Sequence, residues 1–150
     1  MQVQDVMTSP AISVHPATTV EEIARLMLDN RISAVPVVGD RHQLLGIVTE
    51  HDLFLKEKGA PFSMERLPAL FDQWVEPEEL PELYQSTRHY TAADVMTESV
   101  TCIDAEDSLG AVARLMVNRR LKRVPVLHDG HVTGMITRAD LVSLLVQERL

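Results

Sequence analysis

The chain has 150 residues, of which 45% are hydrophobic and 24% charged, and its formal net charge is −8 at pH 7. This composition is typical of one compact soluble domain or two very small ones. The acidic balance argues against a nucleic-acid partner, because phosphate contacts need a basic surface, although a single phosphorylated ligand needs only a local basic pocket.

Several other classes of protein are disfavoured by particular residues. Cys102 is the only cysteine, so neither an internal disulfide nor a cysteine-based metal site is expected. The first residues lack the basic and apolar regions of a secretory signal, and the apolar runs are too short to span a membrane. We therefore expect a soluble cytoplasmic protein with no membrane partner.

An internal duplication organises the chain. A shift of 89 positions aligns residues 5–8 with 94–97, 24–27 with 113–116, and 35–37 with 124–126. After a gap of one residue, Gly46, Thr49, Asp52 and Leu53 align with Gly134, Thr137, Asp140 and Leu141. The sequence thus predicts two repeats, residues 1–58 and 94–150, separated by an insert at residues 59–93.

Each repeat begins with a short strand, expected at residues 12–14 and 100–103. A helix follows, whose N-terminus has a capping box of Thr19 and Glu22. Its apolar stripe in the first repeat consists of Val20, Ile23, Ala24, Met27 and Leu28, and in the second of Leu109, Val112, Ala113, Met116 and Val117.

The second half of each repeat is a strand pair followed by a helix. In the first repeat we expect strands at residues 34–38 and 44–49, and in the second repeat Asp129-Gly130 is a strong hairpin turn signal. The last helices are expected to begin near Glu50 and Arg138.

The predicted fold class is therefore α/β of an α+β-like kind, with two β-α-β-β-α repeats. One such unit is too small to bury enough apolar surface, so we expect the two to pack sheet to sheet as a pseudo-two-fold pair. In the insert, the spacing of Leu67, Leu70, Phe71 and Trp74 predicts a short amphipathic helix, and residues 78–90 are a second candidate. The insert is interpreted either as a structural bridge across the pair or as a dimer or partner contact.

The most informative motif lies where the last strand of each repeat meets the last helix. It reads Gly-x-x-Thr-x-x-Asp and ends at Asp52 in the first repeat and at Asp140 in the second. A Thr-x-x-Asp pattern can simply cap a helix. The same geometry also suits a phosphorylated ligand, because a helix N-terminus attracts anions and a carboxylate one turn on can accept from ribose hydroxyls. The motif alone leaves both interpretations open.

A basic cluster distinguishes the two repeats. Arg119, Arg120, Lys122 and Arg123 stand together, and cations at the end of a helix offset its dipole. Lys122 and Arg123, however, fall beyond the helix, where the first repeat has the uncharged Ser33 and Ala34. We predict that Arg123 contacts a phosphate.

No metal site or catalytic centre is expected. The six histidines lack the spacing of zinc ligands, although His51 lies inside the motif and is a candidate for a phosphate contact when protonated. The chain has no nucleophile elbow, no P-loop and no dinucleotide fingerprint, so we do not expect an enzyme.

Two copies of Asp-Val-Met-Thr, an amphipathic helix, Val-Pro-Val and Gly-x-x-Thr-x-x-Asp-Leu resemble a tandem of cystathionine-β-synthase-type (CBS) domains, known as a Bateman module. The resemblance implies a regulatory sensor of adenosyl ligands such as AMP, ADP, ATP or S-adenosylmethionine, with no cofactor in the catalytic sense. It also implies a homodimer and a separate, unidentified protein partner. The alternative is a structural dimerisation module that binds no small molecule.

The resemblance also implies which residues surround each ligand. One cleft is expected to join Thr137 and Asp140 to Ile12, Ile32, Ser33 and Ala34, and the other to join Thr49 and Asp52 to Thr101, Leu121, Lys122 and Arg123. Ile47 and Met135 are expected to line the apolar walls. Since Ser33 and Ala34 carry no charge, the first of these clefts is expected to bind polyphosphates less tightly.

Overall fold

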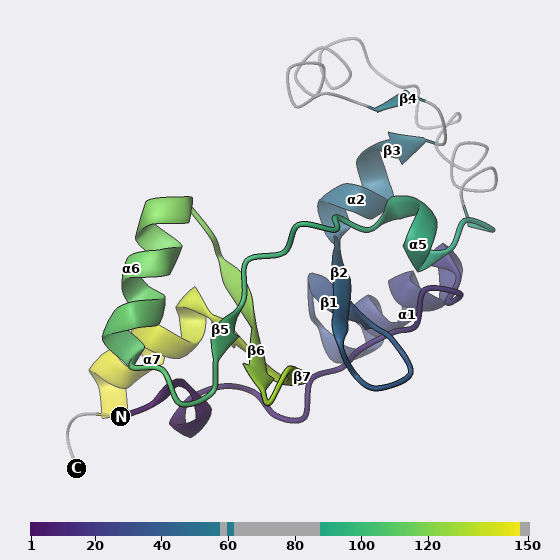
Figure 1. The fold of residues 1–150 in the computed structure, drawn as a ribbon. Helices are drawn as coiled ribbons and strands as arrows, with labels where there is room; N and C mark the ends of the chain where they lie inside the picture. Colours follow the sequence, from purple (N-terminus) through teal and green to yellow (C-terminus); the bar gives the residue numbers. More distant parts are fainter. Residues whose placement is uncertain (58–59, 62–87, 148–150) are drawn as a thin grey trace, which may run out of the picture. The chain divides into compact units, whose positions relative to one another are not determined.

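A computed structural model describes residues 1–57, 60–61 and 88–147 (Figure 1). These residues form two compact units. Unit 1 consists of the described residues of Met1–Ser13, Val38–Leu45 and Ser99–Leu150, and unit 2 of those of Val14–Val37 and Gly46–Glu98. The helix predicted around Trp74 and most of the one predicted at residues 78–90 lie outside the described residues.

Unit 1 contains a three-stranded sheet and two helices. The strands are β5 (Ile103–Asp104), β6 (Arg123–His128) and β7 (His131–Thr137), and the helices are α6 (Leu109–Arg119) and α7 (Arg138–Gln147). β5 pairs with β6 in parallel, and β6 pairs with β7 antiparallel. Asp129 and Gly130 join β6 to β7 with positive φ angles of 51° and 79°, which confirms the predicted hairpin turn.

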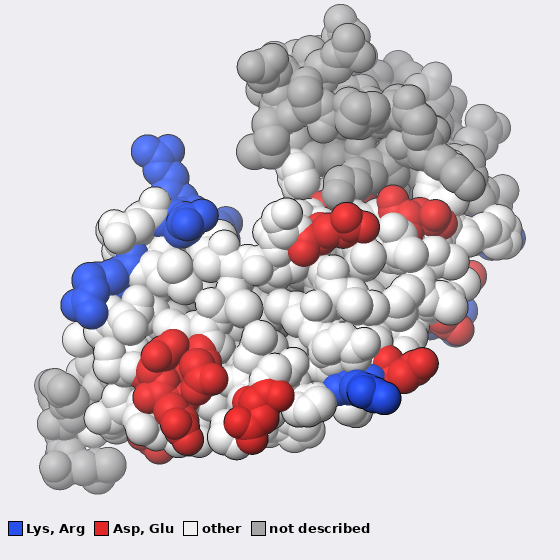
Figure 2. Space-filling model, in the orientation of Figure 1, with Lys and Arg blue, Asp and Glu red and all other residues white. Residues whose placement is uncertain are grey.

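Opposite charges mark the two ends of α6. Figure 2 shows basic side chains over the end of α6 that leads into β6 and acidic side chains over the opposite end. This distribution is favourable, because the helix dipole is negative at its C-terminus and positive at its N-terminus. Lys122 lies beyond the helix and Arg123 begins β6, so these two cations are not part of the helix end.

Unit 2 contains an equivalent set of elements. These are α1 (Val20–Asn30), β1 (Ala34–Val38), β2 (Leu44–Thr49), α2 (Glu50–Leu55) and α5 (Ala92–Val95), although Val38 of β1 and Leu44 and Leu45 of β2 belong to unit 1. β1 pairs with β2, and the short strands β3 (Lys56–Glu57) and β4 (Ala60–Pro61) pair with each other. The predicted mixture of helices and strands is therefore confirmed, as is the capping box of Thr19 and Glu22.

The first strand of each repeat is shorter than the sequence predicts. Residues 12–14 form no strand, only a parallel bridge between Val14 and Val37, and β5 covers Ile103 and Asp104 rather than residues 100–103. Pro10 and Pro16 flank the first of these segments, and proline cannot donate to a sheet ladder. In both repeats the backbone pairing of this segment is therefore limited to one or two residues, and these include one buried side chain, Val14 or Ile103.

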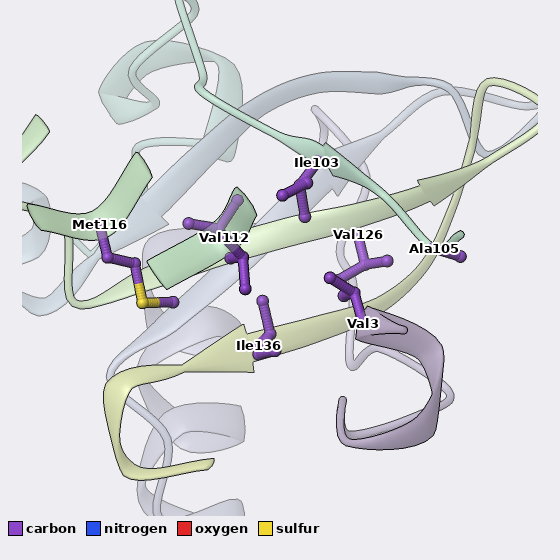
Figure 3. Packing of buried hydrophobic residues seen from close by; sticks show 8 residues of the cluster. Val3, Ile103, Ala105, Val112, Met116, Val126 and Ile136 are labelled. Carbon is purple, nitrogen blue, oxygen red and sulfur yellow. The ribbon is translucent and has the colours of Figure 1, made fainter. Parts of the chain in front are cut away.

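The core of unit 1 lies between its sheet and α6 (Figure 3). Val112 and Met116 of α6 pack with Val124 and Val126 of β6 and with Ile136 of β7, and all are at most 2% exposed. Val3, from the 3-10 helix η1 (Val3–Asp5), is completely buried in the same cluster. A residue near the N-terminus therefore completes the core built by the second repeat.

The helix stripes are narrower than predicted. Val20, Ile23 and Met27 are buried as expected, but Leu28 is 78% exposed and its counterpart Val117 is 75% exposed. Successive residues of an α-helix are rotated by about 100° around its axis, so Leu28 lies about 80° around the helix from Val20. This places Leu28 at the edge of the stripe that is farthest from Ile23. This edge faces away from the sheet, so both repeats leave the same position in solvent.

The first residues of each repeat pack in the unit that is built mainly from the other repeat. In unit 1 the Val3 amide donates to the Asp107 carbonyl at 2.9 Å and the Gln4 amide to the Ala105 carbonyl at 2.9 Å. In unit 2 the equivalent bonds run from Ala92 to Thr18 at 2.8 Å and from Ala93 to Pro16 at 3.0 Å. Each Asp-Val-Met-Thr segment thus packs on the strands and helices of the other repeat.

Candidate functional site

The two Gly-x-x-Thr-x-x-Asp motifs adopt the same geometry at the junctions β2–α2 and β7–α7. The Thr49 amide donates to Asp52 Oδ2 at 2.9 Å, and the Asp52 amide donates to Thr49 Oγ1 at 3.3 Å. The Thr137 amide donates to Asp140 Oδ2 at 2.8 Å, and the Asp140 amide donates to Thr137 Oγ1 at 3.2 Å. These reciprocal bonds are those of a capping box.

The two carboxylates differ in their surroundings. Asp52 is only 4% exposed and also accepts from the Thr49 hydroxyl at 3.1 Å. Asp140 is half-buried, and among the described residues its second oxygen, Oδ1, accepts no hydrogen bond. The Asp140 carboxylate therefore keeps an acceptor that a ligand hydroxyl can use.

A third Thr-x-x-Asp box, which the sequence analysis missed, lies outside the motif. The Thr91 amide donates to Asp94 Oδ2 at 2.9 Å and the Thr91 hydroxyl donates to the same oxygen at 3.1 Å. This box caps the four-residue helix α5, and its two bonds match those of Thr49 and Asp52. The hydrogen bonds of a cap are thus present at both motifs, as one interpretation predicted, and also outside them, so the bonds within a box do not by themselves identify a ligand site.

Thr49 and Thr137 differ from Thr91 because each lies beside a turn that ends a helix. α1 and α6 both end in an arginine with left-handed backbone, Arg31 or Arg120, each with φ of 53°. The next amide returns to the helix, from Ile32 to the Met27 carbonyl at 3.0 Å and from Leu121 to the Met116 carbonyl at 2.9 Å. This is the pattern of a Schellman motif, and it leads the chain directly into β1 or β6.

The turn and the motif are tied together by one backbone hydrogen bond in each unit. The Glu50 amide donates to the Ser33 carbonyl at 3.0 Å, and the Arg138 amide donates to the Lys122 carbonyl at 2.9 Å. In unit 1 the side chain of Arg138 adds a bond from Nε to the Leu121 carbonyl at 2.7 Å. The residues before Val-Pro-Val therefore adjoin the Thr-x-x-Asp motif of their own repeat.

The predicted apolar wall residues lie on the same strand faces as the motif threonines. Ile47 and Thr49 alternate with the buried Val48 on β2, and Met135 and Thr137 alternate with the buried Ile136 on β7. Ile47 exchanges two backbone hydrogen bonds with Thr97, and Met135 exchanges two with Thr8. Each motif strand is therefore joined to the start of the other repeat.

The predicted site residues fall into the two units as follows. Unit 1 contains Ile12, Thr101, Leu121, Lys122, Arg123, Met135, Thr137 and Asp140, and unit 2 contains Ile32, Ser33, Ala34, Ile47, Thr49 and Asp52. Ile12 is 36% exposed and Ala34 is buried. The two predicted groupings each combine residues of both units, and they remain predictions.

The described residues outside the two motifs include histidines and carboxylates that are candidates for other chemistry. No group of three or more His, Cys, Asp or Glu side chains there is suited to hold a metal ion. His51 is exposed on α2. His131, at the start of β7, makes a hydrogen bond through Nδ1 with the carbonyl of Arg41, which lies between β1 and β2. In the part of the chain that the structure describes, no helix is both long and apolar enough to cross a membrane.

Comparisons with known proteins agree on one family. The sequence profile of the CBS domain matches residues 3–58 and 92–147. The chain is 27% identical to the chloroplastic CBS domain-containing protein CBSX1 of Arabidopsis thaliana, covering 89% of this chain and 58% of that protein, so it spans well under two thirds of that relative.

Two solved structures have the same fold. The CBS domain of a CBS domain-containing membrane protein from Sphaerobacter thermophilus has a TM-score of 0.74 and 34% identity, covering 96% of this chain and 87% of that chain. CBSX2 in complex with AMP has a TM-score of 0.72 and 27% identity, covering 99% and 98% of the two chains.

Proposed function

Because this chain belongs to the CBS domain family, we propose that it is a regulatory module, without catalytic activity, that binds an adenosine-containing ligand at its Thr-x-x-Asp motifs. The observation that carries this proposal is the duplicated junction of strand, Thr-x-x-Asp box and following helix. It occurs in a chain that is 27% identical, over 99% of its length, to CBSX2, which has been crystallised with AMP. AMP, ADP, ATP and S-adenosylmethionine are the candidate ligands.

The motif side chains suit the sugar and phosphate of such a ligand. The free Oδ1 of Asp140 can accept from a ribose hydroxyl while Oδ2 keeps its bond to the Thr137 amide. The Thr137 hydroxyl can donate to a phosphate oxygen while still accepting from the Asp140 amide. Binding therefore uses hydrogen-bonding capacity that the cap leaves unused and does not require the helix end to unfold.

A thermal-shift panel tests the proposal. At about 100 times its dissociation constant, a ligand stabilises the folded state by about 2.7 kcal/mol, which raises the melting temperature by about 5–10 °C for a chain of this size. We expect Asp140→Asn and Asp52→Asn to reduce this shift, because asparagine keeps one acceptor for the threonine amide but loses the second carboxylate oxygen.

Asp94→Asn is the matched control, because Asp94 makes the same capping bonds outside the motif. It should leave the ligand-induced shift unchanged, although it can lower the melting temperature of the ligand-free protein. The absence of a shift with all four ligands, or an equal reduction by Asp94→Asn, contradicts the proposal and favours a module that acts only by association.

We further propose that the chain forms a homodimer and passes its signal to a separate protein partner. Support comes from exposed apolar side chains on α7, where Val142, Leu145 and Val146 are 59%, 77% and 76% exposed. These residues are spaced i, i+3 and i+4, so they share one helix face. An apolar helix face of this kind is costly to leave in water, which supports its use as an association surface.

The double substitution Leu145→Lys/Val146→Lys is expected to convert the dimer into a monomer, because two lysines on the apolar face oppose its burial. The measurement is the molar mass by size-exclusion chromatography with light scattering. Leu28→Lys/Val117→Lys changes two equally exposed apolar residues on other helices and serves as the control. A dimer that resists the first pair and is broken by the second would assign the interface to α1 and α6 instead.

A further inference from the structure

The two motifs differ in charge at structurally equivalent positions. The hydrogen bond from Glu50 to Ser33 in unit 2 corresponds to the one from Arg138 to Lys122 in unit 1, so these backbone positions match. The next position along the strand has Ala34 in unit 2 and Arg123 in unit 1. The unit 1 motif thus has three cations where the unit 2 motif has two uncharged residues and a carboxylate.

The strand register places one of these cations beside the motif threonine. Arg123 and Thr137 are directly opposite each other on β6 and β7. Directly opposed residues of an antiparallel pair project from the same face of the sheet, with their Cβ atoms about 5 Å apart. Their neighbours Val124 and Ile136 are completely buried in the core of unit 1, so Arg123 and Thr137 lie on the other face.

The other two cations lie at the same end of the strand pair. Lys122 precedes β6 and is exposed, and Arg138 follows β7 with its Nε bonded to the Leu121 carbonyl. Within the part of the chain that the structure describes, no carboxylate forms an ion pair with Lys122, Arg123 or Arg138. Their positive charge is therefore available to attract an anion, in a chain whose formal net charge is −8.

We infer that the two motifs select ligands by charge: the Thr137–Asp140 motif takes an adenosine ligand with phosphates, and the Thr49–Asp52 motif takes one without. This inference rests on the proposed function and names the ligand class at each motif. Lys122, Arg123 and Arg138 bind the phosphates in unit 1, whereas Glu50 repels them in unit 2. The assignment reverses the grouping implied by the resemblance, which joined Lys122 and Arg123 to Thr49 and Asp52.

Calorimetric titration of the full chain with ADP and with adenosine tests this inference. The exchange Lys122→Ser/Arg138→Glu gives unit 1 the residues of unit 2 at two matched positions. We expect it to weaken ADP binding by about tenfold or more, because charge-assisted hydrogen bonds to phosphate are lost, and to leave adenosine affinity within about threefold.

The reciprocal exchange, Ser33→Lys/Glu50→Arg, is the matched variant. It is expected to create a second ADP site, so that the stoichiometry rises from one ADP per chain to two. Thermal melting of the ligand-free variants checks their folding, and Lys122→Ser alone, at an exposed position, replaces the double variant if that one fails to fold. ADP binding should also weaken with added salt, whereas adenosine binding should not.

The outcomes separate this inference from the function on which it rests. If neither ADP nor adenosine binds the unmodified chain, the selection by charge fails, and the proposed function fails as well only if none of its four candidate ligands stabilises the chain. If both bind but the exchanges change ADP and adenosine affinity equally, or leave both unchanged, only the selection by charge is overturned. An ADP site that survives Lys122→Ser/Arg138→Glu and is lost with Asp52→Asn would place the phosphate ligand in unit 2.

Discussion

Val3→Asp is expected to destabilise unit 1, which is built mainly from the second repeat, and not the unit that contains α1 and β1. Val3 is completely buried: its exposed fraction is 0%, and it packs in the cluster of Val112, Val126 and Ile136. A carboxylate there has no cation among the residues of that cluster, and an unpaired buried charge costs about 3–5 kcal/mol. A loss of that size is a large part of the stability of a small domain.

The same logic predicts the reverse effect at the equivalent position. Ala92 is also 0% exposed, and its amide donates to the Thr18 carbonyl in unit 2. Ala92→Asp should therefore destabilise unit 2, although Ala92 precedes the second repeat in the sequence.

Hydrogen exchange followed by mass spectrometry distinguishes the two variants. Val3→Asp should speed amide exchange most in β6 and β7, and Ala92→Asp should speed it most in α1 and β1. If Val3→Asp sped amide hydrogen exchange more in α1 and β1 than in β6 and β7, it would contradict the packing of Val3 in the core of unit 1.

The second large effect is expected at the motif glycines. A Cβ atom on Gly134 would lie 2.7 Å from the Thr8 carbonyl oxygen and 2.6 Å from Met7 Sδ, and one on Gly46 would lie 2.9 Å from the Thr97 carbonyl oxygen and 2.7 Å from Met96 Sδ. The methionine can move, but the carbonyl belongs to a backbone hydrogen-bonded to the motif strand. Gly134→Ala and Gly46→Ala should therefore each destabilise the protein by about 1–3 kcal/mol.

Gly110→Ala is the control for these substitutions. Gly110 lies in α6, and a Cβ atom there would meet nothing closer than 3.7 Å. Alanine is the better helix former, so this change should stabilise the protein by about 0.5 kcal/mol. Urea denaturation of the three variants provides the measurement. Equal stability of Gly134→Ala and Gly110→Ala would show that the Thr8 carbonyl leaves room for a Cβ atom on Gly134.

These glycines also give a packing reason for two repeated sequence features. The methionine of each Asp-Val-Met-Thr segment lies over the glycine of a Gly-x-x-Thr-x-x-Asp motif in the other repeat, Met7 over Gly134 and Met96 over Gly46. The same segment pairs with Met135 or Ile47, two residues before the motif threonine. A change in how that segment packs therefore acts directly on the strand that holds Thr137 or Thr49.

Much of the secondary structure could be predicted from the sequence because its signals are local. The capping box at Thr19, the Asp129-Gly130 turn and the helix starts at Glu50 and Arg138 depend on residues a few positions apart, and all were confirmed. The edges of the buried surface were less predictable. Leu28 and Val117 fit the helical stripe, but whether a residue at its edge is covered depends on what packs there.

The duplication, the order of elements and the two equivalent motifs could be predicted from residue types alone, because repeated residues at a fixed offset require no knowledge of distant contacts. Tertiary structure decided which segments share a unit. No local pattern indicates that Val3 completes the core around Ile136 or that Met7 covers Gly134, since those residues are more than a hundred positions apart. Strand register likewise decided the neighbour of Thr137: the backbone pairing of β6 with β7, not the residue types, puts Arg123 beside it.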